Sequence, residues 1–347
     1  MSIEDIKLDF SDVLIVPSDQ SIVSSRSDVN LVRRFTLSNL LKLDLECVPI
    51  MAANMDTTGT FEMAKVLSSQ KILTALHKHY PVDEIIAFFN ENPSCVPFTA
   101  VSSGIQDTDF EKLAQIAKHI AIRIICIDAA NGHLKVFTDY ISKVKTSFPL
   151  TIIIAGNAVT PAACMNIIQS GADIVKVGIG SGSVCTTRLM TGVGYPQFSA
   201  IMECADAVHR IGGLIMSDGG CVHAGDISKA FCAGADFVML GGMLSGHDEC
   251  SGTVIQVGEK YKKEFYGMSS STAMVKHYGE VASYRASEGK RVLVDYKGPV
   301  LTTIQSILGG IRSTCTYINV NKIEQMSKNA RFIRVRHQVN TVFGDKN

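Results

Sequence analysis

Residues 174–197, IVKVGIGSGSVCTTRLMTGVGYPQ, join a short apolar run to a glycine-rich loop that carries one cysteine. The run Ile174–Val177 predicts a buried strand, and the glycines after it let the backbone turn tightly and point amides or carbonyls at a bound group. A cysteine presented on such a loop is a candidate nucleophile, with its thiolate as the reactive form. The alternative is a buried cysteine that only packs beside a flexible loop. The rest of the chain favours the nucleophile.

Apolar runs of the same kind recur along the chain, and amphipathic helical segments separate most of them. Eight strands alternating with helices favour a parallel sheet that closes into a (β/α)8 TIM barrel over an open sheet. Strands that are apolar at nearly every position fit burial on both faces. The expected strands are Val48–Ala53, Ile72–Leu76, Phe98–Val101, Arg123–Ile127, Ile152–Ala155, Ile174–Val177, Gly213–Met216 and Phe237–Leu240. The expected helices are Phe61–Leu67, Val82–Phe89, Phe110–Lys118, Leu134–Val144, Ala162–Gln169, Ala200–Val208 and Asp226–Ala233.

No low-complexity linker divides the 347 residues, so we expect one TIM-barrel catalytic domain over residues 1–347. An antiparallel hairpin of Thr253–Val257 with Lys260–Phe265 is expected after the last barrel strand, where an insertion is often a lid or substrate loop. A further helix is expected over Val300–Leu308. The expected parts are an N-terminal cap (1–46), the barrel core (about 48–250), a lid segment (about 251–295) and a C-terminal segment (296–347).

Composition narrows the class of protein. Lys+Arg and Asp+Glu both number 33, which argues against binding to nucleic acid or to a membrane surface. The ten cysteines contain no CxxC or zinc-ligand spacing, so a metal framework is not expected. Scattered thiols without a signal peptide indicate the reducing cytoplasm. Gly156, Asn157 and Pro161 interrupt the longest uncharged run, so no transmembrane segment is expected.

Two glycine pairs, Gly219-Gly220 and Gly241-Gly242, follow the seventh and eighth expected strands. The loops after those strands commonly build a phosphate site in a TIM barrel, although tight turns alone are the alternative. Asp218, just before the first pair, suits a ribose diol because a carboxylate offers two acceptor oxygens. A phosphate and a ribose beside a reactive cysteine indicate a nucleoside monophosphate as substrate.

Seven motifs taken together resemble the IMP dehydrogenase/GMP reductase family over essentially the full chain. They are Ala53-Asn54-Met55-Asp56-Thr57, His77-Lys78-His79-Tyr80, Gly178–Arg188, Ser217-Asp218-Gly219-Gly220-Cys221, Phe237–Gly242, Phe265–Ser269 and Tyr284-Arg285-Ala286-Ser287-Glu288-Gly289.

The resemblance implies the reductase branch of that family, which converts GMP to IMP in purine interconversion and salvage. It implies that Cys185 attacks the purine C2, that ammonia leaves, and that NADPH reduces the covalent thioimidate. Thr187 and Glu288 match the pair that handles protons for the departing amine. A carboxylate beside a hydroxyl can relay a proton in this way.

The resemblance also implies ligand contacts, a homotetramer and a K⁺ ion on the carbonyls of Gly180, Gly182 and Cys185. Arg26 and Lys78 suit the 2′-phosphate of NADPH, although a solvated surface charge is the alternative for either. Residues implied to hold the nucleotide are Ser183, Asp218, Gly219, Gly220, Gly241, Gly242, Tyr266, Gly267, Met268, Ser269, Arg285, Ala286, Ser287 and Gly289, with Ser183 and Tyr266 at the phosphate. Residues implied to hold NADPH are Ser25, Arg26, Lys78, Asp128, Ala129, Ala130, Ile179 and Gly180, with Ser313, Thr314, Cys315 and Thr316 reaching in from a neighbouring subunit.

Three positions depart from the family pattern. Ser181 stands where proline is usual, which predicts a less rigid cysteine loop and leaves the strength of the cation site open. Ala129 replaces a more usual valine and Ser24 a more usual lysine, and neither touches the implied chemistry.

Two other functions remain as alternatives. An IMP dehydrogenase would oxidise IMP with NAD, but the chain lacks its accessory domain, the usual Met-Gly-Ser run at Tyr284–Gly289 and room for a mobile flap after Glu288. A non-catalytic purine-nucleotide sensor would keep the phosphate glycines and lose the nucleophile or the activating pair, yet Cys185, Thr187 and Glu288 are all present.

Overall fold

A closed barrel of eight parallel strands forms the centre of the molecule. The computed structural model describes residues 5–38, 43–279 and 286–336. Strands β3 (Leu43–Ala52) to β10 (Phe237–Leu240) pair in chain order, and β10 also pairs with β3. This closure confirms the predicted (β/α)8 TIM barrel. The strands between are β4 (Ile72–Leu76), β5 (Thr99–Ser103), β6 (Ile124–Asp128), β7 (Ile152–Ala158), β8 (Ile174–Val177) and β9 (Leu214–Asp218).

The barrel strands are apolar at nearly every position because each strand contributes side chains to two hydrophobic cores, one inside the barrel and one between the barrel and its helices. Alternate side chains point to opposite faces of a strand. On β3, Met51 faces the core inside the barrel, whereas Ile50 and Ala52 join the core between the barrel and its helices. On β4, Leu73 and Ile72 divide in the same way. Every residue of β4, β5, β8 and β10 is therefore buried.

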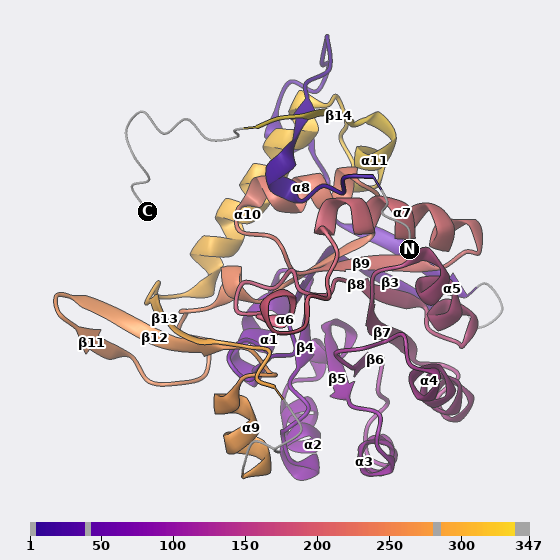
Figure 1. The fold of residues 1–347 in the computed structure, drawn as a ribbon, viewed down its shortest axis with the longest axis vertical. Helices are drawn as coiled ribbons and strands as arrows, with labels where there is room; N and C mark the ends of the chain where they lie inside the picture. The colour runs from indigo at the N-terminus through magenta and orange to yellow at the C-terminus, as the bar shows by residue number, and fades with distance from the viewer. Residues whose placement is uncertain (1–4, 39–42, 280–285, 337–347) are drawn as a thin grey trace.

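Helices surround the barrel, as Figure 1 shows. Two of them begin at a threonine that caps the first turn, with Thr60 Oγ1 accepting from Met63 N at 3.1 Å and Thr160 Oγ1 from Ala163 N at 3.4 Å. All seven helices expected between the strands are confirmed. The outer helices are α1 (Phe61–Ser69), α2 (Val82–Glu91), α3 (Asp107–Ala117), α4 (Lys135–Ser147), α5 (Pro161–Gln169), α7 (Gln197–Arg210), α8 (Ala224–Cys232) and α10 (Val300–Tyr317).

Helix α10 is longer than the sequence predicted. We expected it to end at Leu308, because the pair Gly309-Gly310 is a typical helix end. The helix instead continues through both glycines to Tyr317. Gly310 lies against α8, and a Cβ built there would come within 2.7 Å of Ala224 Cβ. This glycine allows two helices to approach closely and does not end one.

The lid segment forms a small sheet beside the barrel (Figure 1). Strands β11 (Ile255–Val257) and β12 (Lys260–Tyr266) are antiparallel, which confirms the expected hairpin. A third strand, β13 (Arg291–Asp295), which the sequence did not predict, pairs with β12. Helix α9 (Ser271–Tyr278) lies between β12 and β13 along the chain.

The two end regions of the chain pack together. Strand β1 (Val13–Val16) pairs with β14 (Arg331–Arg334), and the short helix η2 (Arg26–Asp28) packs against α10. The remaining elements are β2 (Arg33–Ser38), which pairs with β3, and the short helices η1 (Phe10–Asp12), η3 (Pro93–Phe98), α6 (Thr187–Thr191), η4 (Gly242–Leu244), η5 (Ile323–Gln325) and α11 (Met326–Asn329). Among the described residues, no helix combines the length and the apolar character needed to cross a membrane.

Candidate active site

The loop after β8 presents Cys185 at the carboxyl end of the barrel, the face on which this fold places its chemistry. Cys185 is partly exposed, and its Sγ donates to Thr187 Oγ1 at 3.2 Å. Thr187 Oγ1 in turn donates to Glu288 Oε2 at 2.7 Å. The structure thus brings the three expected catalytic residues into one hydrogen-bonded chain, although Glu288 lies 101 positions after Thr187.

Backbone bonds hold Glu288 beside the cysteine loop. Thr186 N donates to Glu288 O at 2.8 Å, and Lys290 N donates to Val184 O at 2.9 Å. Between these bonds, Cys185 and Gly289 form an antiparallel bridge. The end of the lid segment is therefore fastened to the loop at Glu288 itself and two residues further on.

Arg188 stiffens the cysteine loop. Its Nη1 lies 3.2 Å from Asp9 Oδ2 and its Nη2 donates to Tyr195 O at 2.7 Å. Its side chain passes so close to two glycines that a Cβ built at Gly180 or Gly194 would come within 2.6 or 2.7 Å of Arg188 Cγ. Gly180 also has a φ of +79°, a conformation that side chains disfavour.

Ser181, which stands where proline is usual, forms its own tether. Its Oγ donates to Asp218 O at 3.1 Å, so the serine joins the cysteine loop to the end of β9. This bond offsets part of the freedom that we expected from the missing proline. The strength of the cation site stays a prediction.

Three loops meet where the nucleotide residues were expected. A Cβ built at Gly219 would come within 2.5 Å of Ser181 Oγ, and one built at Gly242 within 2.5 Å of Ser183 Oγ. The loops after β8, β9 and β10 are therefore in contact. Because Gly219 and Gly220 have φ of +94° and +82°, they hold a turn that side chains disfavour beside Asp218.

The two ends of the lid segment pack against each other beside the cysteine loop. A Cβ built at Gly267 would lie 3.3 Å from Gly289 Cα, and Glu288 N donates to Ser269 O at 3.1 Å. Ser287 Oγ accepts from Ser271 N at 3.1 Å, while Ala286 is exposed. Arg285 lies outside the described residues, so its expected contact with the nucleotide stays a prediction.

Tyr266 does not match its expected role at the phosphate. The residue is 6% exposed, and its hydroxyl donates to Asp56 Oδ2 at 2.9 Å. A hydroxyl engaged by a buried carboxylate is not presented to a ligand. We correct its role to that of an anchor for the loop that carries Met268, whose Sδ accepts from Asp56 N at 3.3 Å.

Asp56 is the centre of a cluster that the sequence did not reveal. It is 1% exposed, and besides Tyr266 its Oδ2 accepts from His277 Nε2 and, at 3.2 Å, from Lys276 Nζ. Burial opposes ionisation of this carboxyl, but His277 and Lys276 outweigh it and hold the pKa of Asp56 below its ordinary value. Helix α9 is thus bound to the end of β3 through one carboxylate.

His79 extends this cluster. Its ring stacks on that of His277 with centroids 3.4 Å apart and planes 7° apart, and donor atoms of Asp56, His79 and His277 lie within 4.8 Å of one another. A metal ion binds in the plane of an imidazole, and two parallel rings at this separation share no such point. We therefore assign no metal. Burial, followed by the charge of His277, lowers the pKa of His79 to about 4, which keeps it neutral near pH 7.

Half of the residues expected to hold the cofactor lie at one rim of the barrel. Lys78 follows β4, Asp128 ends β6 and Ala129-Ala130 follow it, while Ile179 and Gly180 follow β8. Lys176 on β8, which the sequence analysis did not single out, is paired with both Asp128 and Asp218. A lysine inside an apolar strand was the only signal for it.

The other expected cofactor residues lie at the far end of α10. That helix begins at the catalytic rim, where Val300 N donates to Glu249 Oε2 at 2.9 Å, and ends against the N-terminal cap, where Ser18 N donates to Tyr317 O at 2.9 Å. Ser25 and Arg26 belong with this end of α10, because η2 packs against the helix and Ile22 N, shortly before η2, donates to Asn319 Oδ1 just past the helix end. We had grouped them with Lys78, and the structure separates them. The residues at this end of α10 are Ser313, Thr314, Cys315 and Thr316, of which Cys315 is fully buried.

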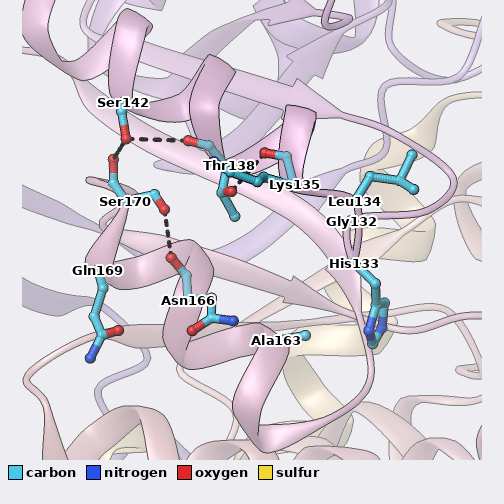
Figure 2. Close-up of a pocket in the computed structure, with 10 residues that line it drawn as sticks. All are labelled: Gly132, His133, Leu134, Lys135, Thr138, Ser142, Ala163, Asn166, Gln169 and Ser170. Carbon is cyan, nitrogen blue, oxygen red and sulfur yellow. Dashed lines mark hydrogen bonds between the residues drawn. The ribbon is translucent and has the colours of Figure 1, made fainter.

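A groove between α4 and α5 lies away from Cys185 on the outer layer of helices. Figure 2 shows its lining, and its volume is about 420 Å³. Ser142 Oγ donates to Ser170 O at 3.0 Å, and Ser170 Oγ donates to Asn166 O at 2.7 Å. These side chains cap helix carbonyls, so we assign the groove no part in catalysis.

Comparisons with known proteins show which family the chain resembles. The family model described as IMP dehydrogenase / GMP reductase domain matches residues 7–341. GMP reductase 1 of Mus musculus is 54% identical over 341 residues, with 98% of each chain covered. GMP reductase 2 of Homo sapiens is 54% identical over 342 residues with the same coverage. A GMP reductase of Phytophthora infestans is 54% identical over 98% of this chain and 94% of its own.

Proposed function

This chain belongs to the IMP dehydrogenase/GMP reductase family, and from that premise we propose that it is an NADPH-dependent GMP reductase. The reaction is the reductive deamination of GMP to IMP with release of ammonia. The observation that carries the proposal is the hydrogen-bonded chain Cys185–Thr187–Glu288. It joins a nucleophile to a proton relay at the position where the phosphate and ribose residues converge.

In the proposed mechanism, the Cys185 thiol passes its proton through the Thr187 hydroxyl to the Glu288 carboxylate, and the resulting thiolate attacks C2 of the purine and forms a C–S bond. The bond from C2 to the exocyclic amine then breaks, and the amine leaves as ammonia after taking a proton through the Thr187 hydroxyl from Glu288. NADPH, when bound, supplies the hydride that takes the place of the amine at C2. The C–S bond then breaks and returns the electron pair to Cys185. Covalent catalysis divides one difficult substitution into two easier steps.

The residues at the strand ends fit both ligands. Asp218 has its carboxylate at the rim for a ribose diol, and the glycine turns at Gly219-Gly220 and Gly241-Gly242 would present backbone amides to a phosphate. Lys78 and Asp128 lie at the same rim for NADPH. We propose K⁺ on the carbonyls of Gly180, Gly182 and Cys185, because neutral backbone oxygens suit a monovalent cation.

We further propose a homotetramer in which the end of α10 completes the cofactor site of a neighbour. A rise of about 1.5 Å per residue puts Ser313 about 20 Å along the helix from Val300. Ser313, Thr314 and Thr316 therefore lie well along the helix from the rim at which it begins, and we propose that they serve a neighbour's site together with Ser25 and Arg26. The ten cysteines, all free, support our assignment to the cytoplasm.

Absorbance at 340 nm tests the function directly. We expect NADPH to be consumed when GMP is added, with IMP and ammonia formed in equal amounts and NADH a poorer donor. Formation of NADH from IMP and NAD would instead identify an IMP dehydrogenase. GMP binding without turnover, and without an adduct on Cys185 by mass spectrometry, would identify a nucleotide sensor.

A further inference from the structure

Lys176 places a buried positive charge between the two halves of the proposed site. The residue is 1% exposed inside the barrel. Its Nζ donates to Asp128 Oδ1 and lies 3.4 Å from Asp218 Oδ2. One carboxylate ends β6 on the cofactor side, and the other ends β9 on the nucleotide side. A single ammonium therefore contacts a candidate binding residue for each ligand.

The intervening strand β7 is shaped to permit this bridge. Asp128 is level with Gly156, and Gly156 is level with Lys176, in the register of β6, β7 and β8. A Cβ built at Gly156 would come within 2.5 Å of Lys176 Cβ, so any side chain there would displace the lysine. The next residue, Asn157, donates through Nδ2 to Asp218 Oδ2 at 2.9 Å and to Gly178 O at 2.8 Å. Strand β7 thus yields space to Lys176 and supplies a second donor to Asp218.

The lysine is charged in this setting. Burial opposes the charge, but Asp128 and then Asp218 outweigh burial and raise the pKa of Lys176 above its ordinary value. When one ammonium group pairs with two carboxylates, its hydrogen-bonding capacity and its charge are divided between them. If a ligand donates hydrogen bonds to one carboxylate, that carboxylate depends less on the ammonium group. The ammonium group can then interact more strongly with the other carboxylate.

We propose that Lys176 is a positioning residue that couples the nucleotide site to the cofactor site through Asp218 and Asp128. This inference rests on the proposed function, which assigns a ligand to each carboxylate. When ribose hydroxyls donate to Asp218, Lys176 holds Asp128 more firmly in the place that the cofactor uses. Coupling between two binding sites is reciprocal, so the cofactor favours nucleotide binding by the same factor.

Calorimetric titration of GMP, with and without saturating NADP⁺, measures this coupling without turnover. We expect NADP⁺ to tighten GMP binding by about 5-fold or more in the native protein. Lys176→Met should weaken the binding of GMP and of NADP⁺ measured alone, and it should bring the coupling factor to about 1. Lys176→Arg, which keeps the charge, should retain most of the coupling. Lys176→Gln, which keeps a hydrogen-bond donor without the charge, replaces Lys176→Met if that variant does not fold.

Lys263→Met is the matched control, because Lys263 is also a buried lysine and donates to His247 O at 2.9 Å and Cys250 O at 2.7 Å. It should lower stability and leave the coupling factor unchanged. A coupling factor that survives in Lys176→Met, or one that is lost in Lys263→Met as well, overturns the proposal. A native protein that binds both ligands independently overturns it too, while the proposed function stands. A native protein that does not bind GMP overturns the proposed function and this inference together.

Discussion

Glu288 reaches Thr187 from a segment 101 residues further along the chain, and the contact between them is the basis of the proposed proton relay. Glu288→Gln keeps the shape of the side chain but cannot exchange a proton. We expect kcat with GMP and NADPH to fall by about 10²- to 10⁴-fold, with the Kd for GMP changed only a few-fold. Stopped-flow absorbance and calorimetry measure the two quantities.

Glu259→Gln is the control for charge, because Glu259 is exposed at the turn between β11 and β12. It should turn over normally. If Glu288→Gln also kept full turnover, the relay would have to be assigned to another group.

His77 makes stability depend on pH. Burial lowers its pKa to about 4 from 6.5, so the unfolded chain binds more protons than the folded one between these values. Stability is therefore expected to fall as pH drops from about 6.5 toward 4, by about 1–2 kcal/mol at pH 5 from this residue. Urea unfolding at pH 7.5 and pH 5 measures the loss.

His77→Phe should show a smaller loss, because it removes the titrating group and can keep the stacking on Tyr80, whose ring centroid is 3.9 Å away. An equal loss of stability in the two proteins would show that other groups, His79 among them, dominate the pH dependence.

The roles of individual residues could be predicted from the sequence only where the residues belong to a recognisable motif. Cys185, Thr187 and Glu288 were all expected, and the structure brings them together. The direction of the Tyr266 hydroxyl and the partners of Lys176 were not, since each depends on which groups the fold buries beside it.

At the scale of elements, the two glycines of α10 should respond oppositely to one methyl group. Gly310→Ala would force its Cβ within 2.7 Å of Ala224 Cβ and separate α10 from α8, at a cost of about 1–3 kcal/mol. Gly309→Ala meets nothing within 4 Å and should stabilise the helix by about 0.5–1 kcal/mol. Thermal unfolding of both variants tests this. If Gly310→Ala stabilised the protein, α10 and α8 would have to be far enough apart to accept a methyl group between them.

Helix α9 should depend on Asp56. Asp56→Asn removes the negative charge that binds Lys276 and His277, so we expect amide exchange in α9 to become about 10- to 100-fold faster. Hydrogen-exchange mass spectrometry of the lid peptides reads this directly. Asp295→Asn breaks the ion pair with Lys262 in the sheet of β11, β12 and β13, and it should leave amide exchange in α9 unchanged. Equal exchange in all three proteins would remove Asp56 as the anchor.

Elements were predictable where their pattern is local. The eight barrel strands are apolar runs that are buried on both faces, and each was found with its ends within five residues of the prediction. Strand β13 was missed because it alternates between exposed and half-buried residues and pairs only with β12. The end of α10 was misplaced because a glycine that ends a helix and one that packs against another helix look alike in sequence.

At the scale of the whole molecule, the reactivity of the cysteines shows whether the barrel and the C-terminal segment unfold together. Eight are buried, and burial raises the pKa of Cys47, Cys126 and Cys315 to about 12. In the native protein we expect Cys185 to react first with a thiol reagent and GMP to protect it. If residues 1–347 form one domain, the buried thiols from β3 to α10 should become reactive over one range of urea concentration. Earlier labelling of Cys315 than of Cys126 would make the C-terminal segment a separate unit.

The fastening of Glu288 to the cysteine loop has a consequence for timing. The carboxylate is carried by the strip of backbone that we propose contacts the nucleotide, and the bonds from Thr186 N to Glu288 O and from Lys290 N to Val184 O join this strip to the cysteine loop. Any movement that lifts this strip to let a nucleotide out also withdraws the carboxylate from Thr187. The segment that must move to release the product then also carries the proposed proton source. Glu288 therefore contacts Thr187 only while the site is closed, and this contact has to form again before the next turnover.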